Sequence, residues 1–400
     1  MPTILSRSRL LINNILLIIS QEAVMKKSNV ITIVCILFVV SSIGASYNKS
    51  VCGPDLGQEL DSAAQKAYDL RMQGKVDDAK AVLEQAILQN PNNAATHYEF
   101  ARIQLHRALG IGIGSREVLF DMISDAKNQI NKAVELNPKN VIYNFFSGHI
   151  GFLQAYLSLM TGDEPKEKLL EAIGAFESAL KLQPDYYPVI LYLIELYSQF
   201  PEESGGDKSK AEQYVLQLEG IGNVFGDKAR SILLPEEVDK VDYWQKVQKK
   251  YEGNADILEE LGKAYLGVDK VDSAVYCFNK AIEIDSEKKF LFLDLSIYYS
   301  FLGMRAGDNK ELLKKCVMSG DSAIVRYIES KPIHPMLAYS FGVRGKFKFF
   351  SGDQEQGQTL IKEAETLDPY FSRATGAPRE ELFIPIGEIS KKHRYLMRPF

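Results

Sequence analysis

The chain carries a recurring pattern of small and large apolar residues at helical spacings. A small residue is followed after four positions by a large apolar one and after three more by another small or apolar one; in most instances a Pro or Ser follows. Spacings of four and three place these side chains on one helix face, and Pro cannot continue a helix. The instances are Ala79–Pro91, Ala126–Pro138, Ala172–Pro184, Ala274–Ser286 and Gly357–Pro369, with weaker ones at Ala211–Leu218 and Ala323–Pro335.

Another apolar helical stretch precedes these helices, so the pattern predicts helical hairpins. The most regular hairpin is Ala255–Ser286, where Gly262 and Ala274 are small because the two helices must approach closely there. Large side chains such as Tyr265 and Phe278 fill the space around that contact. The set Leu258, Leu261, Gly262, Tyr265, Ala274, Phe278 and Ala281 resembles the tetratricopeptide repeat family, and the resemblance extends over roughly residues 60 to 370.

The resemblance implies an all-α fold, an α-α superhelix of about seven or eight hairpins in residues 60–369, because one hairpin cannot bury its apolar face alone. The register is lost between residues 222 and 253, although a helix carrying Trp244, the only Trp, is expected there. The hairpins also hold extra residues around Ile111, Gly162 and Gly307. These residues either emerge at one rim of the solenoid, often its binding side, or simply lengthen the helices.

The N-terminal residues 1–45 read as a targeting segment, with Met25 as a better start than Met1. Two Lys after Met25 precede the apolar run Val30 to Val40, and small residues end at Ala45. This order is typical of a signal peptide, so we expect export to the periplasm or an equivalent compartment, with residues 46–59 as a linker. The alternative is an uncleaved membrane anchor at residues 30–45, although the run is short for a membrane-spanning helix.

The C-terminal residues 370–400 depart from the repeat. Pro and Gly residues, among them Gly376, Pro378, Pro385 and Pro399, leave little room for a helix. Lys391, Lys392, Arg394 and Arg398 make this end basic. Its apolar residues, among them those at 382–384 and 395–397, require cover. The extension is therefore either a cap that folds back over an exposed helix face, as end repeats need, or an arm that docks into a partner.

Catalytic and metal-binding patterns are absent from the sequence. The five His show no HxxxH or HExxH spacing, and no CxxC occurs. The run Gly110–Gly114 lacks the Gly-Lys-Ser/Thr ending of a phosphate-binding loop. We therefore expect no enzyme, no metal and no cofactor. The net charge of −5, without a long Lys/Arg run, predicts no nucleic-acid partner.

Aromatic residues gather on the expected first helices, which line the concave face of a tetratricopeptide superhelix. Such residues either anchor a partner there or pack between hairpins. The candidates for partner binding are Tyr143, Phe146, Tyr187, Tyr192, Phe290, Tyr298, Trp244 and Phe383. We expect a non-enzymatic scaffold or assembly factor that binds protein partners through this face or its insertions, within an envelope or respiratory complex. The alternative is a membrane-tethered receptor or chaperone adaptor; an enzyme with its site in an insertion is the least favoured reading.

Overall fold

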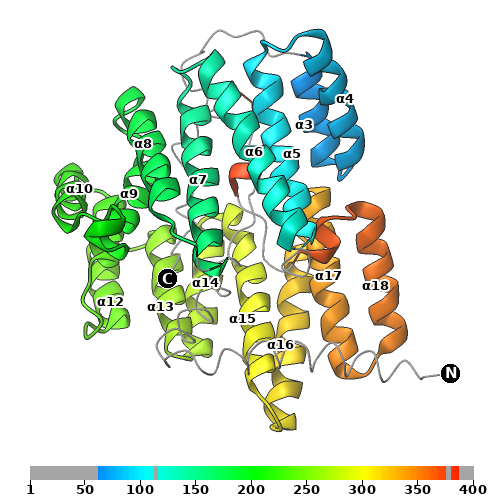
Figure 1. Cartoon of the computed structure of the whole chain (residues 1–400). Helices are drawn as coiled ribbons and strands as arrows, with labels where there is room; N and C mark the ends of the chain where they lie inside the picture. Colours follow the sequence, from blue (N-terminus) through cyan, green and yellow to red (C-terminus); the bar gives the residue numbers. More distant parts are fainter. Residues whose placement is uncertain (1–61, 112–115, 162, 375–379, 387–400) are drawn as a thin grey trace.

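The structure is a computed structural model, which describes residues 62–111, 116–161, 163–374 and 380–386. These residues form α-helices and short 3₁₀ helices (Figure 1). In chain order the helices are α3 Ser62–Met72, α4 Val76–Gln89, α5 Ala94–Ile111, α6 Arg116–Leu136, α7 Val141–Thr161, α8 Lys166–Leu182, α9 Tyr187–Gln199, η3 Glu202–Ser204, α10 Lys208–Ile221, α11 Val224–Ile232, α12 Lys240–Lys250, α13 Ala255–Gly267, α14 Val271–Ile284, η4 Ser286–Phe290, α15 Leu291–Arg305, α16 Lys310–Ile328, α17 His334–Ser351, α18 Gln354–Leu367, η5 Phe371–Arg373 and η6 Glu380–Phe383.

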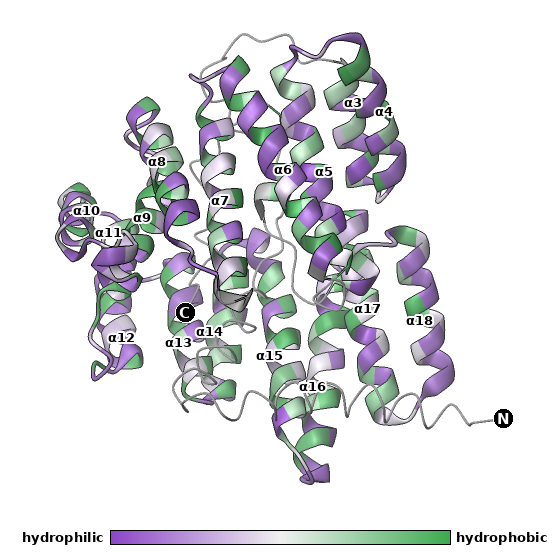
Figure 2. Ribbon diagram, viewed as in Figure 1, coloured by the Kyte–Doolittle hydropathy of each residue, from purple (hydrophilic) through white to green (hydrophobic). Residues whose placement is uncertain are grey.

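The helices pair as antiparallel hairpins that stack into an array, as the predicted all-α superhelix requires. The hairpins are α3–α4, α5–α6, α7–α8, α9–α10, α13–α14, α15–α16 and α17–α18, with α11 and α12 between the fourth and fifth. Small residues allow the close approach within a hairpin. A Cβ on Gly262 of α13 would overlap the ring of Phe278 on α14, and Gly148 of α7 faces Phe176 of α8 in the same way. Figure 2 shows hydrophobic and hydrophilic residues alternating around the helices, as expected for helices that bury one side.

Helix α12 joins the irregular part of the array to the most regular hairpin. Its Trp244 is fully buried with Val241 and Val247 against Ile257 and Leu261 of α13. The side chain of Asp239 accepts hydrogen bonds from the backbone N–H groups at the start of α12, which fixes where that helix begins. The lost repeat register therefore reflects a spacer helix that is packed on the next hairpin.

Most of the extra residues in the hairpins lengthen helices. In the regular hairpin, α13 and α14 have 13 and 14 residues. By contrast, α6 and α7 each have 21 residues, and α16 has 19. The expectation of longer helices is thus correct for these segments. Residues 112–115 and 162, which belong to two of the predicted insertions, lie outside the described part of the chain.

The array closes on itself, because its last hairpin and the residues after it pack against its first two hairpins. Helix α17 contacts α3, and η5 and η6 both contact α5 (Figure 1). The approach is tight: a Cβ on Gly74, after α3, would overlap the backbone carbonyl of Leu367, and one on Gly110 would overlap Tyr370. Gly74 also has a φ of +75°, a conformation that favours glycine.

None of the helices in the described ranges is both long and apolar enough to cross a membrane. The predicted targeting segment, residues 1–45, and the predicted linker, residues 46–59, lie outside those ranges, so both remain predictions.

Candidate interaction surface

The first helices of the hairpins have two distinct sides, and α3 shows them most clearly. Ala67 of α3 packs toward α4, in a cluster with Val76 and Leu83. Ala64 and Tyr68 belong to a different cluster, which they form with Ile386 from the end of the described chain. Each first helix has one side that points away from its second helix, and we call these sides together the inner face. The first helices are α3, α5, α7, α9, α13, α15 and α17.

Residues 368–374 and 380–386, which we call the closing segment, bind the inner face at the start of the array. Nε2 of His106 on α5 lies 2.7 Å from Oδ2 of Asp368, and the ring of Phe371 stacks on the His106 ring at 3.9 Å between centroids. The Tyr370 hydroxyl donates to Asp77 Oδ1 at 2.7 Å and accepts from Arg107 Nε at 3.2 Å. Burial lowers the pKa of His106, although Asp368 acts in the opposite direction.

Two side chains of the inner face hold the backbone of the closing segment. Arg102 Nη2 donates to the carbonyl oxygen of Leu382 at 2.5 Å, and the Tyr68 hydroxyl donates to that of Phe383 at 3.1 Å. The side chains of Leu382, Phe383 and Ile384 are buried. The two hydrogen bonds reach backbone carbonyls and so do not depend on the identity of the bound residues, whereas the buried side chains do.

A buried charge cluster supports these donors. Arg71 and Arg102 are both fully buried and flank Glu99: Arg71 Nε donates to Glu99 Oε1 at 2.6 Å, and Arg102 Nη1 lies 3.4 Å from Glu99 Oε2. The Arg102 guanidinium also lies over the rings of Tyr68 and Tyr98, 5.3 and 4.9 Å from their centroids. Burial raises the pKa of Tyr98 to about 12. Such fixed, desolvated donors form strong hydrogen bonds.

Acidic side chains are buried on other first helices. Glu260 of α13 and Asp294 of α15 each stand two residues before a buried small residue, as Glu99 does on α5. Glu195 on α9 and Glu259 on α13 are buried as well. Near α13, Lys288 Nζ lies 2.7 Å from Glu259, and Lys228 Nζ lies 3.5 Å from Glu260. The first helices thus combine apolar and aromatic residues with several buried carboxylates.

The predicted binding residues lie in the core rather than on an open surface. Tyr143, Phe146, Tyr192, Phe290, Tyr298, Trp244 and Phe383 are all buried, and Tyr187 is partly buried against Phe225. Packing between hairpins explains this: Tyr143 and Phe146 contact the Tyr98 ring, and Tyr192 stacks on Phe176. Of the two alternatives that the sequence left open, packing between hairpins describes the position of these seven side chains. Whether any of them contacts a partner stays a prediction.

Sequence reasoning missed the polar residues that hold the closing segment. Glu99, Arg102 and His106 recur at intervals of three and four on α5, and none is exposed. A row of charged residues on one face of an otherwise apolar helix is the signal that could have found them. Residues 382–386 cover part of α3 and α5. Whether residues 370–400 serve as a cap or as a docking arm stays a prediction.

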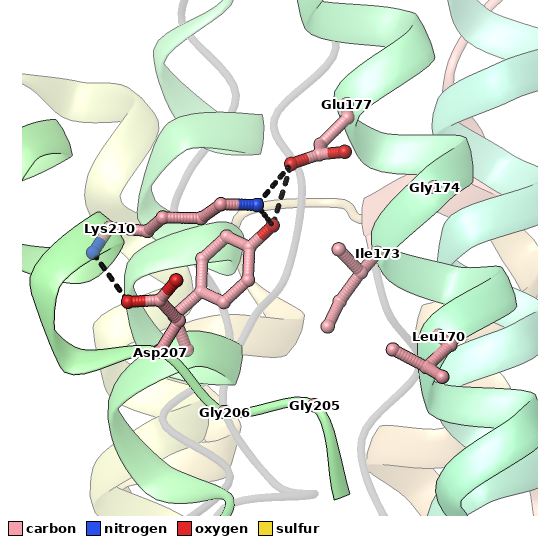
Figure 3. A pocket seen from close by; sticks show the side chains of 9 residues that line it. Leu170, Ile173, Gly174, Glu177, Gly205, Gly206, Asp207 and Lys210 are labelled. Carbon is pink, nitrogen blue, oxygen red and sulfur yellow. Dashed lines mark hydrogen bonds and ion pairs between the residues drawn. The ribbon is translucent and has the colours of Figure 1, made fainter. Parts of the chain in front are cut away.

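A small pocket lies on the outside of the array, between α8 and α10 (Figure 3). It has a volume of about 300 Å³ and is lined by Leu170, Ile173, Gly174, Glu177, Tyr197, Gly205, Gly206, Asp207 and Lys210. The Tyr197 hydroxyl donates to Glu177 at 2.6 Å, and Lys210 Nζ donates to that hydroxyl at 3.2 Å. Burial and the Glu177 carboxylate raise the pKa of Tyr197. The polar groups in the pocket therefore bond to one another.

Within the ranges that the structure describes, no group of three or more His, Cys, Asp or Glu side chains is placed to hold a metal ion. The thiols of Cys277 and Cys316 are buried, and burial raises the pKa of both, for Cys277 to about 11. Thiols with raised pKa values are poor nucleophiles at neutral pH.

Residues 255–288 match the family model described as tetratricopeptide repeat. A search of curated proteins found no match to the chain. Among solved structures, the chain is similar to TTC0263, a tetratricopeptide protein of Thermus thermophilus, at 20% identity and a TM-score of 0.32, covering 60% of this chain and 97% of that chain.

Two other solved structures have comparable scores. A tetratricopeptide repeat protein from Parabacteroides merdae is 14% identical, with a TM-score of 0.32, and covers 80% of this chain and 99% of that chain. The human IFIT1 dimer with m7Gppp-AAAA is 13% identical, with a TM-score of 0.35, and covers 85% of this chain and 73% of that chain. At these scores no residue of either protein can be assigned to a position here. What the family match establishes is that the chain contains a tetratricopeptide repeat at residues 255–288, within an all-α array of stacked hairpins.

Proposed function

We propose that this chain is a non-enzymatic protein-binding scaffold whose inner face binds a polypeptide segment. The observation that carries the proposal is the way Arg102 and Tyr68 hold the carbonyl groups of Leu382 and Phe383. The inner face already binds one peptide backbone, its own. Main-chain hydrogen bonds supply affinity in peptide recognition, while neighbouring side-chain contacts supply specificity.

The stacked hairpins suit this function because they hold the binding side chains in place before a partner arrives. A preformed surface loses little conformational entropy on binding. The buried cluster of Arg71, Glu99 and Arg102 fixes the donors in position. The raised pKa values of the two buried thiols and the mutually bonded groups of the outer pocket favour binding over catalysis.

The cellular setting that we propose is export, followed by assembly of an envelope or respiratory complex. This rests on the signal-like order of residues 25–45 in the sequence. N-terminal sequencing of the native protein tests it: a mature chain that begins after Ala45 supports export as a soluble protein. Retention of Val30 to Ala45 would instead support the membrane-tethered receptor or adaptor.

Purification of the native chain under mild conditions tests the scaffold proposal. We expect a protein that co-purifies at constant stoichiometry, rebinds when both components are pure, and forms chemical cross-links to the first helices. The outer pocket provides a matched control, because Leu170→Asp changes an exposed pocket residue far from that contact in sequence. Partner binding that is lost with Leu170→Asp, or cross-links confined to the second helices, would refute the inner face as the binding site. A nucleic acid as the only stoichiometric component would refute the proposed class of partner.

A further inference from the structure

Three donor atoms beneath the closing segment have no hydrogen-bond partner within the described ranges. They are Nη1 and Nη2 of Arg71 on α3 and Nε of Arg102 on α5. Both side chains are fully buried. Buried polar groups in proteins are nearly always hydrogen-bonded, and a charged donor without an acceptor is costly. These atoms therefore indicate a place for an acceptor that the described chain does not supply.

The remaining nitrogen atoms of the two guanidinium groups are already used. Arg71 Nε donates to Glu99, Arg102 Nη1 donates to the Tyr98 hydroxyl, and Arg102 Nη2 donates to the carbonyl oxygen of Leu382. In Arg71 the two Nη atoms form one edge of a planar group. Such an edge matches the two oxygen atoms of a carboxylate, which it can bind with two parallel hydrogen bonds.

The charges in this cluster are not balanced. In the part of the chain that the structure describes, Glu99 is the carboxylate that pairs with Arg71 and Arg102, so two cations share one anion. Asp368 is bound elsewhere: its Oδ2 pairs with His106, and its Oδ1 accepts from the backbone N–H groups at residues 370 and 371. A second carboxylate at Arg71 would therefore complete the cluster in charge as well as in hydrogen bonding.

The closing segment covers the cluster but serves it poorly. Tyr68 and Arg71 are three residues apart on α3 and so lie on one side of that helix. This side contacts the closing segment, because the Tyr68 hydroxyl bonds to the carbonyl oxygen of Phe383. From α5, Arg102 holds the carbonyl of Leu382. Among its described residues, the segment thus offers Arg102 one neutral acceptor and offers the Nη edge of Arg71 none.

We propose that this site prefers a polypeptide segment with a Glu or Asp among apolar residues, and that such a partner segment replaces residues 382–386 on α3 and α5. The partner's carboxylate binds the Nη edge of Arg71, while its backbone carbonyls accept from Arg102 and Tyr68. The inference rests on the proposed function for the identity of the binding surface, and it adds the class of partner. Charge-assisted hydrogen bonds are stronger than neutral ones. The internal segment lowers the partner's apparent affinity by the fraction of sites that it occupies.

Labelled peptides based on residues 380–386 test this preference on the full chain by fluorescence anisotropy. In three peptides Glu replaces Leu382, Phe383 or Ile384, and three matched peptides carry Gln there, which has the same shape without the charge. We expect at least one Glu peptide to bind about tenfold more tightly than its Gln counterpart, since a hydrogen bond to a charged group contributes on that order. Equal binding within every Glu and Gln pair, or binding by none of the peptides, would overturn the proposal.

Two variants of the full chain locate the preference. Arg71→Met should abolish the difference between the Glu and Gln peptides. Arg326→Met, which changes an exposed arginine on α16, should leave the difference intact. A difference that persists without Arg71, or that disappears without Arg326, would contradict the assignment of the carboxylate to Arg71.

Hydrogen exchange of the unsubstituted chain tests the replacement itself and does not depend on any variant folding. With the tighter Glu peptide at saturation, we expect faster exchange of the backbone amides at residues 382–386 and unchanged exchange in α13 and α14. Unchanged exchange at residues 382–386 would overturn the replacement. The proposed function would stand if a protein co-purified and cross-linked to the first helices although the Glu and Gln peptides bound alike.

Discussion

Single residues at the closure are polar or charged and yet buried. His106 and Asp368 are both fully buried, and Arg71, Glu99 and Arg102 form a second buried group beside them. A buried polar group without a partner destabilises the fold. A substitution that removes one member of a buried pair is therefore expected to lower the free energy of unfolding. The closure is therefore sensitive to conservative substitutions and to pH.

Acid is expected to weaken the fold through His106. Burial holds the pKa of His106 below its ordinary value of about 6.5, so the unfolded chain takes up a proton more readily than the folded one. The stabilisation of the fold by neutral, buried His106 is fully present at pH values above the ordinary pKa of about 6.5. It is lost as the pH falls below that ordinary pKa. We expect wild type to lose about 1 kcal/mol more than His106→Asn between pH 7.5 and 5.5, in urea unfolding at both pH values. Asn retains an N–H donor for Asp368, so identical losses in the two proteins would contradict this role of His106.

Two glycines are expected to respond in opposite directions to the same substitution. Gly262→Ala places a methyl group against the Phe278 ring and should destabilise the fold by about 1–3 kcal/mol. Gly174→Ala meets nothing within 4 Å in the middle of α8 and should stabilise it by up to about 1 kcal/mol. Thermal unfolding of both variants measures the difference. Destabilisation by Gly174→Ala, or none by Gly262→Ala, would show that the hairpin contacts are not as described.

At the scale of elements, the helices could be predicted from the sequence, but their contacts across the array could not. Spacings such as Ala274, Phe278 and Ala281 are local, so they identify a helix and its buried face without further information. The pairing of His106 with Asp368 joins residues 262 positions apart, and no local pattern indicates it. Aromatic residues on long first helices could face either a groove or the next hairpin, and only the stacking decides between these positions.

Deletion of the closing segment should release the first hairpins selectively. A chain that ends at Pro369 loses the buried side chains of Phe371, Leu382 and Phe383, each worth about 1.5–3 kcal/mol when fully buried. We expect faster hydrogen exchange in α3 and α5, with unchanged exchange in α13 and α14, which pack on the buried Trp244 of α12 and on each other. A uniform increase along the whole chain would mean that the segment has no specific role at the start of the array.

At the scale of the whole molecule, the array is closed, and the closure affects how a partner can reach the inner face. In an open solenoid the two end hairpins are the most distant, whereas here Tyr370 bonds to Asp77 at the start of α4. Closure gives both ends cover, as terminal repeats require. It also encloses the inner face, so that access to this face depends on the segment that closes the array.

The distance between the two end hairpins tests this closure most directly. Spin labels at the exposed positions Asp78 of α4 and Thr366 of α18, in a chain whose native Cys are replaced by Ser, report that distance by pulsed electron resonance. A second pair, Asp78 and Gln213 of α10, provides the comparison. The closed array predicts a narrow distribution for the first pair, at a shorter distance than for the second, although the first pair is farther apart in sequence. A first-pair distance that is longer than the second, as in an open superhelix, would contradict the closed array.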